Sequence, residues 1–415
     1  MMVRYELKKM FGTFGGKIAL FLYAAIVLLS CWLAATGALN LGTDWVNEQG
    51  EHETGISAIG KMRSAQNEWE GYLDQETLTR VIQENARINA TPEGQSKNAQ
   101  KSDIAFGWKQ GFIPIRELIN RSYASGFRSY DYYRTDGISV IKEETFYANR
   151  INLLKDWLYD KTDVAYDLYS EAEKQYIISQ YEELETPFYF DYHDGWYQLL
   201  ENAGFIPSLG VLILGFLLAG IFSNEFKWKA DSVYFSTLLG RNKAISAKIK
   251  AGLILVTILY WAAMMLYSLF TLCYFGFEGA GCVIQLRVWK SLYNITMWQA
   301  WVLALICGYI GNLFLAILTM FISAKSKSSV IAVTTPFVIM FIPSFLLGMA
   351  DWLDVIVNMM PINLLEFYQH LGTFNLITIL GKVYRTIDLC IPLYTILTVL
   401  LVPVIYHNYS RKQIA

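Results

Sequence analysis

The residue types that could carry out phosphate or metal chemistry are few and unsuitably spaced in this 415-residue sequence. The stretch GTFGGK has the glycines and the lysine of a phosphate-binding loop, but its spacing differs, and Ile18 stands where Ser or Thr is required. Only four histidines occur, far apart, at His52, His193, His370 and His407, and there is no H-E-x-x-H or paired C-x-x-C spacing. We therefore expect a chain that is not an enzyme, with no catalytic residue, metal site or cofactor of its own.

The apolar runs of the chain contain almost no charged residues. Ion-coupled carriers usually keep acidic, basic or histidine side chains within their membrane spans as coupling sites, so their scarcity argues against that class. The most notable polar residue is Asn312, in CGYIGN. We interpret it as a helix-to-helix contact, made possible by the small neighbours Gly308 and Gly311.

Six uncharged apolar runs, each of about 18 residues or more, are long enough to cross a bilayer. They are predicted at 18–39, 205–222, 252–277, 298–324, 330–349 and 389–406. The first run is too long for the apolar core of a signal peptide, and we expect it to be an anchor. The predicted fold class is therefore mainly α: a polytopic membrane protein with about six transmembrane helices and a mostly helical extracellular domain between the first two.

The orientation follows from the lysines and arginines, which stay on the cytoplasmic side in short flanking segments. They collect at four places on one side of a six-span alternation: Arg4, Lys8, Lys9 and Lys17; Lys227, Lys229, Arg241, Lys243, Lys248 and Lys250; Lys325 and Lys327; and Arg411 and Lys412. We expect a multi-pass protein of the cell (plasma) membrane with both termini cytoplasmic.

The chain is thus expected to divide into eight parts. They are 1–17, a cytoplasmic amphipathic helix; 18–39, span one; 40–204, the extracellular domain; 205–223, span two; 224–251, a cytoplasmic segment; 252–349, spans three to five; 350–388, short external or re-entrant helices; and 389–415, span six with a cytoplasmic tail.

Acidic residues outnumber basic ones between 40 and 204. A nucleic-acid partner is not expected, because the basic residues collect along the membrane rim rather than in a separate patch. None of the five cysteines lies in that domain, so no disulfide framework is expected there.

The first residues form an amphipathic pattern. Leu7, Met10 and Phe14 share one helical face with Val3, and Arg4, Lys8 and Lys9 surround the other. The pattern fits a helix lying in the interface of the lipid bilayer, and it equally fits a basic flank that orients the first span.

Local signals also mark the large insert and the segment before the last span. Asp74 is predicted to cap one helix, Ser170 with Glu173 to form a capping box for another, and 91–102 to be a loop. The aromatic stretch 186–200 is either an interfacial belt or a surface, including Asp191 and Asp194, that meets a cationic or amphipathic substrate. Two short apolar pieces within 350–388 are interpreted as short helices at the outer leaflet.

The segment 224–252 is the most informative. Asp231 is predicted to cap a short helix that ends at Leu239, with Gly240 as a left-handed stop. This helix would expose Val233, Tyr234, Phe235, Leu238 and Leu239, which is more apolar surface than water tolerates without a partner. The alternative is that these side chains pack onto the ends of the chain's own spans.

The order of these parts resembles the permease subunit of an ABC transporter of the type-2 membrane-domain class, a bacterial exporter-like family. The local match is F-x-x-E-F-K-x-x…LLGRxKxIxxKI, which begins at Phe222 and ends at Ile249. The resemblance covers nearly all of the membrane part, but the insert departs from the family plan, in which the first external loop is short.

The resemblance implies that 231–239 is the coupling helix that docks on a separate ATP-binding subunit, where ATP and Mg²⁺ would be held. The implied interface residues are Glu225, Trp228, Asp231, Tyr234, Phe235, Leu238, Leu239 and Arg241. It also implies a second permease copy or a sister permease, a pathway along spans one, two and five, and an amphipathic substrate such as a peptide, antibiotic or lipid.

Two other hypotheses remain open. A mechanotransmission permease also has an external domain between its first two spans, but its usual plan has four spans. A ligand-sensing receptor with an acidic ectodomain would need neither six spans nor a coupling helix.

Overall fold

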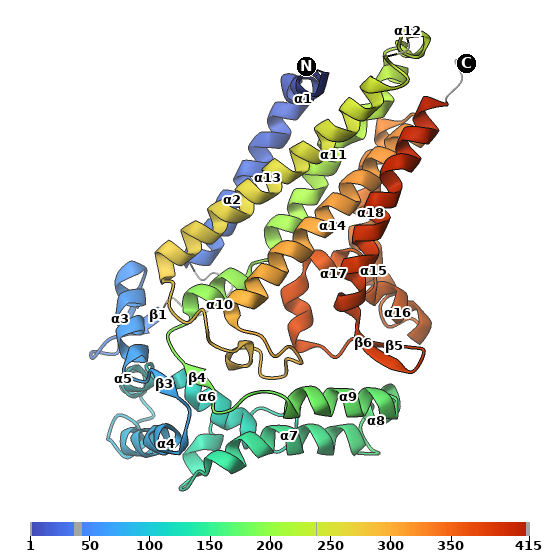
Figure 1. Cartoon of the computed structure of the whole chain (residues 1–415). Coiled ribbons are helices and arrows are strands. Elements are labelled where there is room, and N and C mark those ends of the chain that lie inside the picture. Colours follow the sequence, from blue (N-terminus) through green and yellow to red (C-terminus); the bar gives the residue numbers. More distant parts are fainter. Residues whose placement is uncertain (1, 37–43, 238, 412–415) are drawn as a thin grey trace.

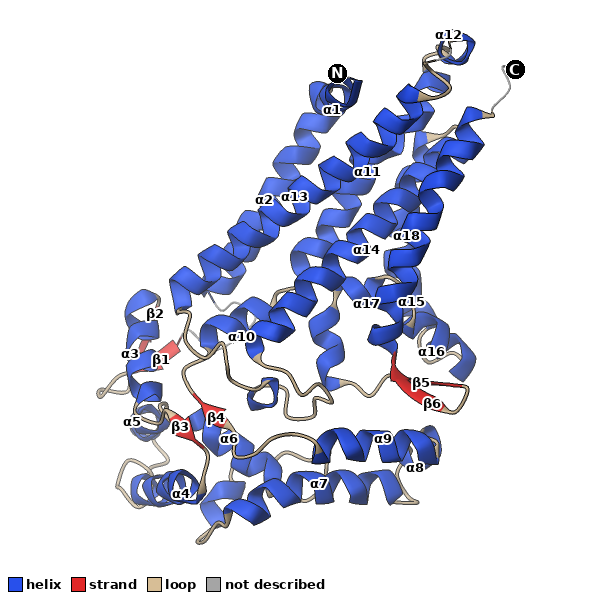
Figure 2. Ribbon diagram, viewed as in Figure 1, coloured by secondary structure: helices blue, strands red, loops and turns tan. Residues whose placement is uncertain are grey.

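The computed structural model describes residues 2–36, 44–237 and 239–411, and this part of the chain is mainly helical (Figures 1 and 2). Within it, six helices are long and apolar enough to cross a membrane. They are α2 (Phe14–Thr36), α11 (Phe205–Lys227), α13 (Lys243–Phe275), α14 (Met297–Ser326), α15 (Ser329–Leu346) and α18 (Thr386–Ser410). These helices fit a multi-pass membrane protein.

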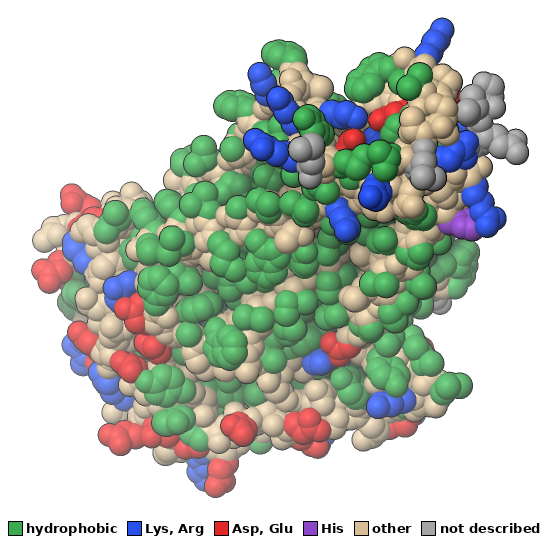
Figure 3. All heavy atoms as spheres, turned by 45° about the horizontal axis from the view of Figure 1, so that its top comes forward, with side chains coloured by type: hydrophobic (Ala, Val, Ile, Leu, Met, Phe, Trp, Pro, Cys, Tyr) green, Lys and Arg blue, Asp and Glu red, His purple; other side chains and the backbone are tan. Residues whose placement is uncertain are grey.

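The six helices form one bundle with two different ends (Figure 1). Both termini lie at one end, together with α1 (Met2–Gly12) and α12 (Asp231–Ser236), and we call it the terminal end. The large insert covers the other end. In Figure 3, apolar side chains cover the bundle surface between a terminal end rich in Lys and Arg and an insert rich in Asp and Glu.

Helix α14 is the centre of the bundle and contacts α11, α13, α15 and α18. A Cβ on Gly308 would lie 2.5 Å from the Tyr260 hydroxyl, so the glycine permits close packing of α13 and α14. Asn312 Nδ2 donates to the Gly308 carbonyl at 2.9 Å and to the Pro207 carbonyl of α11 at 3.4 Å. Its interpretation as a helix-to-helix contact is confirmed.

The insert is built mostly from helices, with two short antiparallel strand pairs, β1–β2 and β3–β4. Its elements are β1 (Asp44–Val46), β2 (His52–Thr54), α3 (Ile56–Asn67), β3 (Gly71–Tyr72), α4 (Gln75–Asn89), α5 (Ala99–Lys109), α6 (Ile113–Ser122), the 3₁₀ helix η1 (Arg134–Gly137), α7 (Glu143–Tyr159), α8 (Ala165–Leu168), α9 (Glu171–Glu182) and β4 (Tyr189–Phe190). Asp74 caps α4 by accepting from the Thr77 N–H at 2.9 Å, and Ser170 with Glu173 forms the capping box of α9, so both caps are confirmed. The predicted loop 91–102 is shorter than expected, because Asn98 caps α5.

The insert and the bundle share a packed seam rather than a linker. Helix α10 (Asp194–Glu201), which was expected to belong to the insert, packs against α13 and α14. The loop between α13 and α14, which contains the 3₁₀ helix η2 (Ile284–Leu286), packs into the insert. There, Arg150 of α7 donates to the carbonyl oxygens of Trp289 and Ser291 at 3.2 to 3.3 Å.

The suggested aromatic and acidic surface around Asp191 and Asp194 is wrong. Asp194 is buried in the seam, where it pairs with Arg287 of the α13–α14 loop. Asp191 is half-buried and accepts the Gly279 N–H at 2.9 Å. The loop that follows α13 covers the Asp194 carboxylate and already donates to that of Asp191, so the two do not form an open acidic surface.

The segment before α18 differs from the two short helices expected there. It has α16 (Asp351–Asn358), α17 (Ile362–Leu365) and the 3₁₀ helix η3 (Phe367–Gly372), and then an antiparallel hairpin of β5 (Leu376–Ile379) and β6 (Lys382–Arg385). The two turn residues, Leu380 and Gly381, both have positive φ. Such a two-residue turn matches the twist of a hairpin, and the β-branched residues around Thr378 favour strands.

The amino-terminal helix is shorter than the predicted range 1–17. Helix α1 ends at Gly12, and Thr13 Oγ1 then accepts the Gly16 N–H at 3.0 Å and starts α2. Leu7 and Met10 are partly buried and pack against the core, as expected for two residues on one helical face. Phe14, which was predicted to share that face, begins α2 and is 80% exposed. The expectation that Phe14 extends this face is therefore wrong, because the helix breaks before it.

Candidate functional site at the terminal end of the bundle

The short helix α12 projects beyond the ends of the long helices (Figure 1). Its N-cap is Ala230, which has no capping side chain, and the helix ends at Ser236. The predicted cap at Asp231 is therefore wrong: Asp231 is the first helical residue. There its negative charge still faces the positive end of the helix dipole.

Gly240 closes the segment in a way that differs from the predicted left-handed stop. Its φ is not positive, and a Cβ at this position would overlap the carbonyl oxygen of Tyr234. The Gly240 N–H donates to Thr237 Oγ1 at 3.0 Å. The glycine is needed for the close approach of two backbone segments, not for a special conformation.

Phe235 and Arg241 fasten α12 to the bundle. Phe235 is only 2% exposed, and its ring centroid lies 5.2 Å from that of Tyr409 in α18. Arg241 Nε donates to the Phe235 carbonyl at 2.7 Å, and its Nη1 donates to the Ser410 carbonyl at 3.1 Å. For Phe235, therefore, the alternative stated above is correct: this side chain packs onto the chain's own spans.

Three other apolar side chains of the same segment are exposed, of which Trp228 lines the cavity described below. Trp228 is 57% exposed, Val233 70% and Leu239 51%. Leu238, another predicted interface residue, lies outside the described residues. The terminal end therefore presents a small apolar surface on an element that is fixed at its base.

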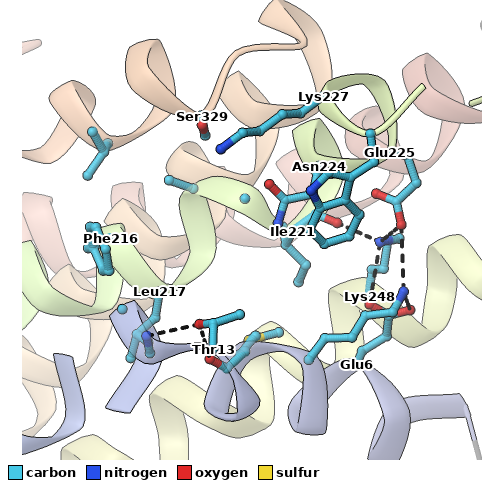
Figure 4. A pocket seen from close by; sticks show the side chains of 18 of the residues that line it. Glu6, Thr13, Phe216, Leu217, Ile221, Asn224, Glu225, Lys227, Lys248 and Ser329 are labelled. Atoms are coloured by element: carbon cyan, nitrogen blue, oxygen red, sulfur yellow. Dashed lines mark hydrogen bonds and ion pairs between the residues drawn. The ribbon is translucent and has the colours of Figure 1, made fainter. Parts of the chain in front are cut away.

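A cluster of charged side chains, largely buried except for Lys9, joins the three helices α1, α11 and α13 (Figure 4). Lys248 Nζ of α13 donates to Glu225 Oε1 of α11 at 2.8 Å and to the Ile221 carbonyl at 2.6 Å. It also lies 3.4 Å from Glu6 Oε2 of α1. Lys9 Nζ lies 3.3 Å from Glu6 Oε1 and 3.7 Å from Glu225 Oε1. We call Glu6, Lys9, Glu225 and Lys248 the charge cluster.

Among the charge cluster, only Glu225 was predicted as a site residue. The sequence does contain a signal that Lys248 is buried. Ile245 lies three residues before it and Gly252 four residues after it, so all three share one helical face, and both neighbours are buried. A lysine on the apolar face of a spanning helix is a site hypothesis by default. By sequence, Lys248 belongs to the basic flank and to the motif that ends at Ile249, but it is not among the implied interface residues.

Two polar atoms near the cluster are buried and have no hydrogen-bond partner among the described residues: Glu225 Oε2 and the Tyr234 hydroxyl oxygen. Burial, with the negative charges of Glu225 and Glu6, raises the pKa of Tyr234, so this hydroxyl stays protonated and can donate. In Figure 4 the second oxygen of Glu225 points away from Lys248, toward the side of Asn224. Such groups usually meet water or a ligand.

A cavity of about 450 Å³ opens beside the charge cluster, between α1 and the start of α2 on one side and α11 and α15 on the other (Figure 4). Its apolar lining includes Met10, Phe216, Leu217, Trp228, Val330 and Val333. Its polar lining comes from the charge cluster together with Thr13, Asn224, Lys227 and Ser329. The cavity has the mixed lining of a site for an amphipathic molecule.

No protein-family model and no curated protein matches this chain. The geometry of the terminal end is therefore the basis for its functional assignment.

Proposed function

We propose that this chain is the membrane-spanning permease subunit of an ATP-driven ABC exporter of the type-2 class, which moves an amphipathic substrate such as a peptide, an antibiotic or a lipid. The supporting observation is α12, a short helix fixed at its base by Phe235 and Arg241, on which Val233 is exposed, with Leu239 exposed just after its end. Exposed apolar groups on a fixed projection suit a protein partner. A separate ATP-binding subunit docks there and holds ATP and Mg²⁺.

The proposed orientation places the terminal end in the cytoplasm and the insert outside the cell membrane. It is supported by the Lys and Arg side chains that gather at the terminal end, beyond the apolar band (Figure 3). A cytoplasmic ATPase can reach α12 only in this orientation.

The charge cluster supports transmission of force from α12. It connects the helix just before α12 (through Glu225) to α13 (through Lys248) and α1 (through Glu6). When the ATP-binding subunits close, a pull on α12 moves these helices together, because separating the buried charges is costly.

The position of the cavity supports the proposed pathway. Its walls include the start of α2, the second half of α11 and the start of α15, which are spans one, two and five. A second copy of this chain, or a sister permease, completes the pathway on the open side.

The test is reconstitution in lipid nanodiscs with each phosphate-loop ATP-binding subunit of the same cell in turn. We expect one such pair to copurify and the chain to stimulate ATP hydrolysis. The variant Val233→Glu/Leu239→Glu should abolish both, because it places charges on the docking surface, and the matched variant Val233→Ile/Leu239→Met should retain both. Full stimulation by the glutamate variant would refute the docking surface.

A second candidate, a ligand-sensing receptor, is favoured by a cavity of about 460 Å³ in the insert. Indole rings and carboxylates both attract organic cations, so the cavity suits such a ligand. Its lining includes Trp45, Trp69, Trp108, Glu48, Glu53 and Glu68. Binding of tetramethylammonium that is lost in Trp108→Ala, in a chain that stimulates no ATPase, would favour the receptor over the exporter.

A further inference from the structure

The cavity at the terminal end is open to the lipid-facing surface. Phe216 and Val330, which line it, are more than half exposed, and Val333 lies one turn further along α15. These side chains continue the apolar band of the spanning helices. An alkyl chain that lies against α11 and α15 can therefore enter sideways while its head group reaches the polar lining.

One part of the polar lining suits a phosphate group. Lys9 and Lys227 bring two ammonium groups to the cavity, and Lys227 forms no ion pair with any described residue. In Figure 4 the Lys227 side chain extends toward Ser329. Ser329 and Val330 begin α15, so their N–H groups have no acceptor within the helix and the positive end of its dipole faces the same space.

Another part suits a primary ammonium group. Glu225 is 95% buried by its neighbours, yet its Oε2 has no hydrogen-bond partner in the described part of the chain. The other oxygen, Oε1, already accepts from Lys248. A buried carboxylate oxygen without a donor is costly, and an ammonium with three N–H groups satisfies it with charge as well as hydrogen bonds.

From these subsites we infer that the cavity binds the head group of a phospholipid that carries a primary ammonium beside its phosphate. The phosphate lies between Lys9, Lys227 and the start of α15, the ammonium meets Glu225, and an acyl chain lies along Phe216 and Val333. The inference rests on the proposed function for one point, namely that this lipid enters the pathway from the cytoplasmic leaflet. The binding itself requires no ATPase.

The test measures lipid binding to the purified full-length chain alone, by native mass spectrometry. The probes are dihexanoyl phosphatidylethanolamine, dihexanoyl phosphatidylcholine and dihexanoyl phosphatidylglycerol. We expect the ethanolamine lipid to bind about tenfold more tightly than the other two, since choline has no N–H to donate and glycerol has no charge. Equal binding of all three would overturn the inference.

Matched variants locate the binding. Lys9→Gln/Lys227→Gln should weaken binding of all three lipids by about tenfold. The control Lys8→Gln/Lys250→Gln removes the same charge from exposed lysines of the terminal end that do not line the cavity, and should bind as the native chain does. An equal loss in both variants would show general attraction to anions and would overturn the site.

Two further variants separate the ammonium subsite from the rest. Glu225→Gln should remove the preference for ethanolamine over choline. Since this change also touches the ion pair with Lys248, Val333→Trp provides an independent test: it fills the cavity, leaves the pair intact, and should block all three lipids. Native binding by a folded Val333→Trp variant would overturn the inference.

The source of the head group and the proposed function are tested separately. Free phosphoethanolamine that binds as tightly as the lipid would indicate a soluble ligand and overturn the lipid assignment. Failure of the Val233 and Leu239 variants to affect any ATPase would refute the exporter but not the lipid site. If the cavity variants bind lipid as tightly as the native chain, the lipid site is refuted, but the proposed docking of the ATPase is not affected.

Discussion

Lys248 of α13 and Glu225 of α11 form a buried ion pair with a separation of 2.8 Å between Nζ and Oε1. Only 2% of the Lys248 side chain and 7% of the Glu225 side chain are exposed. Two charges withdrawn from water are tolerated only when they compensate each other. The pair therefore fixes the relative position of the two helices that flank α12.

The variant Lys248→Met should be strongly destabilised, because it leaves the Glu225 carboxylate buried without its partner. We expect the free energy of unfolding to fall by about 3 kcal/mol or more. Thermal unfolding of the purified chain, followed by tryptophan fluorescence, measures the change. The double variant Lys248→Met/Glu225→Leu should lose less than Lys248→Met alone, and additive losses would contradict a coupled pair.

Gly240→Ala should displace α12, because the new Cβ overlaps the Tyr234 carbonyl oxygen and the backbone must move. We expect a loss of about 2 kcal/mol in unfolding free energy and a loss of ATPase stimulation. The control is Gly12→Ala, at a glycine with nothing within 4 Å of the new Cβ. Native stimulation by Gly240→Ala would show that the position of α12 is unimportant.

The seam between insert and bundle should weaken in mild acid. His193 is fully buried; its Nε2 accepts from Arg287 Nε at 2.9 Å, so its Nδ1 donates to the Asp191 carbonyl at 2.7 Å. Burial and the Arg287 charge lower the pKa of His193 to about 3. In the unfolded chain this imidazole takes up a proton below a pKa of about 6.5, and in the folded chain it does not.

Stability should therefore fall as the pH is lowered from 7, by about 1 kcal/mol at pH 5.5. Burial also raises the pKa of the neighbouring Asp191, which opposes this effect only at lower pH, where carboxylates begin to protonate. Chemical unfolding at pH 7 and 5.5 measures the difference. The variant His193→Gln should reduce this pH dependence; His370, whose pKa burial also lowers, contributes with the same sign. An unchanged dependence in His193→Gln would assign the effect to other groups.

Cys282 in the seam should be unreactive toward thiol reagents while the chain is folded. It has no exposed surface, and burial raises its pKa to about 12. In a background where the other four cysteines are alanine, we expect maleimide to label Cys282 at pH 8 at least about 100-fold more slowly in the folded chain than in the denatured chain.

The matched control for Cys282 is Gly281→Cys/Cys282→Ala, which moves the thiol by one residue into open space. This thiol should react at the rate of an exposed cysteine. Rapid labelling of native Cys282 would mean that the seam opens readily.

Local features of this protein could be predicted from the sequence because they depend on neighbours in the chain. The six apolar runs follow from composition, since the length of an uncharged run decides whether it can cross a bilayer. The caps at Asp74 and Ser170 follow from side chains that bond to backbone groups three residues away. The helix contact of Asn312 was also expected from its small neighbours.

Tertiary structure decided the features that join distant segments. Lys248 and Glu225 lie 23 residues apart on different helices, and only the packing of α11 against α13 removes both from water. The same holds for Asp194, buried by a loop that follows α13, and for Gly240, whose role depends on where the Tyr234 carbonyl lies. Pairing across space depends on the relative placement of whole elements, which residue types and spacing along one chain do not specify. The sequence by itself therefore determined which segments are long and apolar enough to cross a membrane and which side chains cap α4 and α9, and the fold alone decided which polar groups meet at the terminal end.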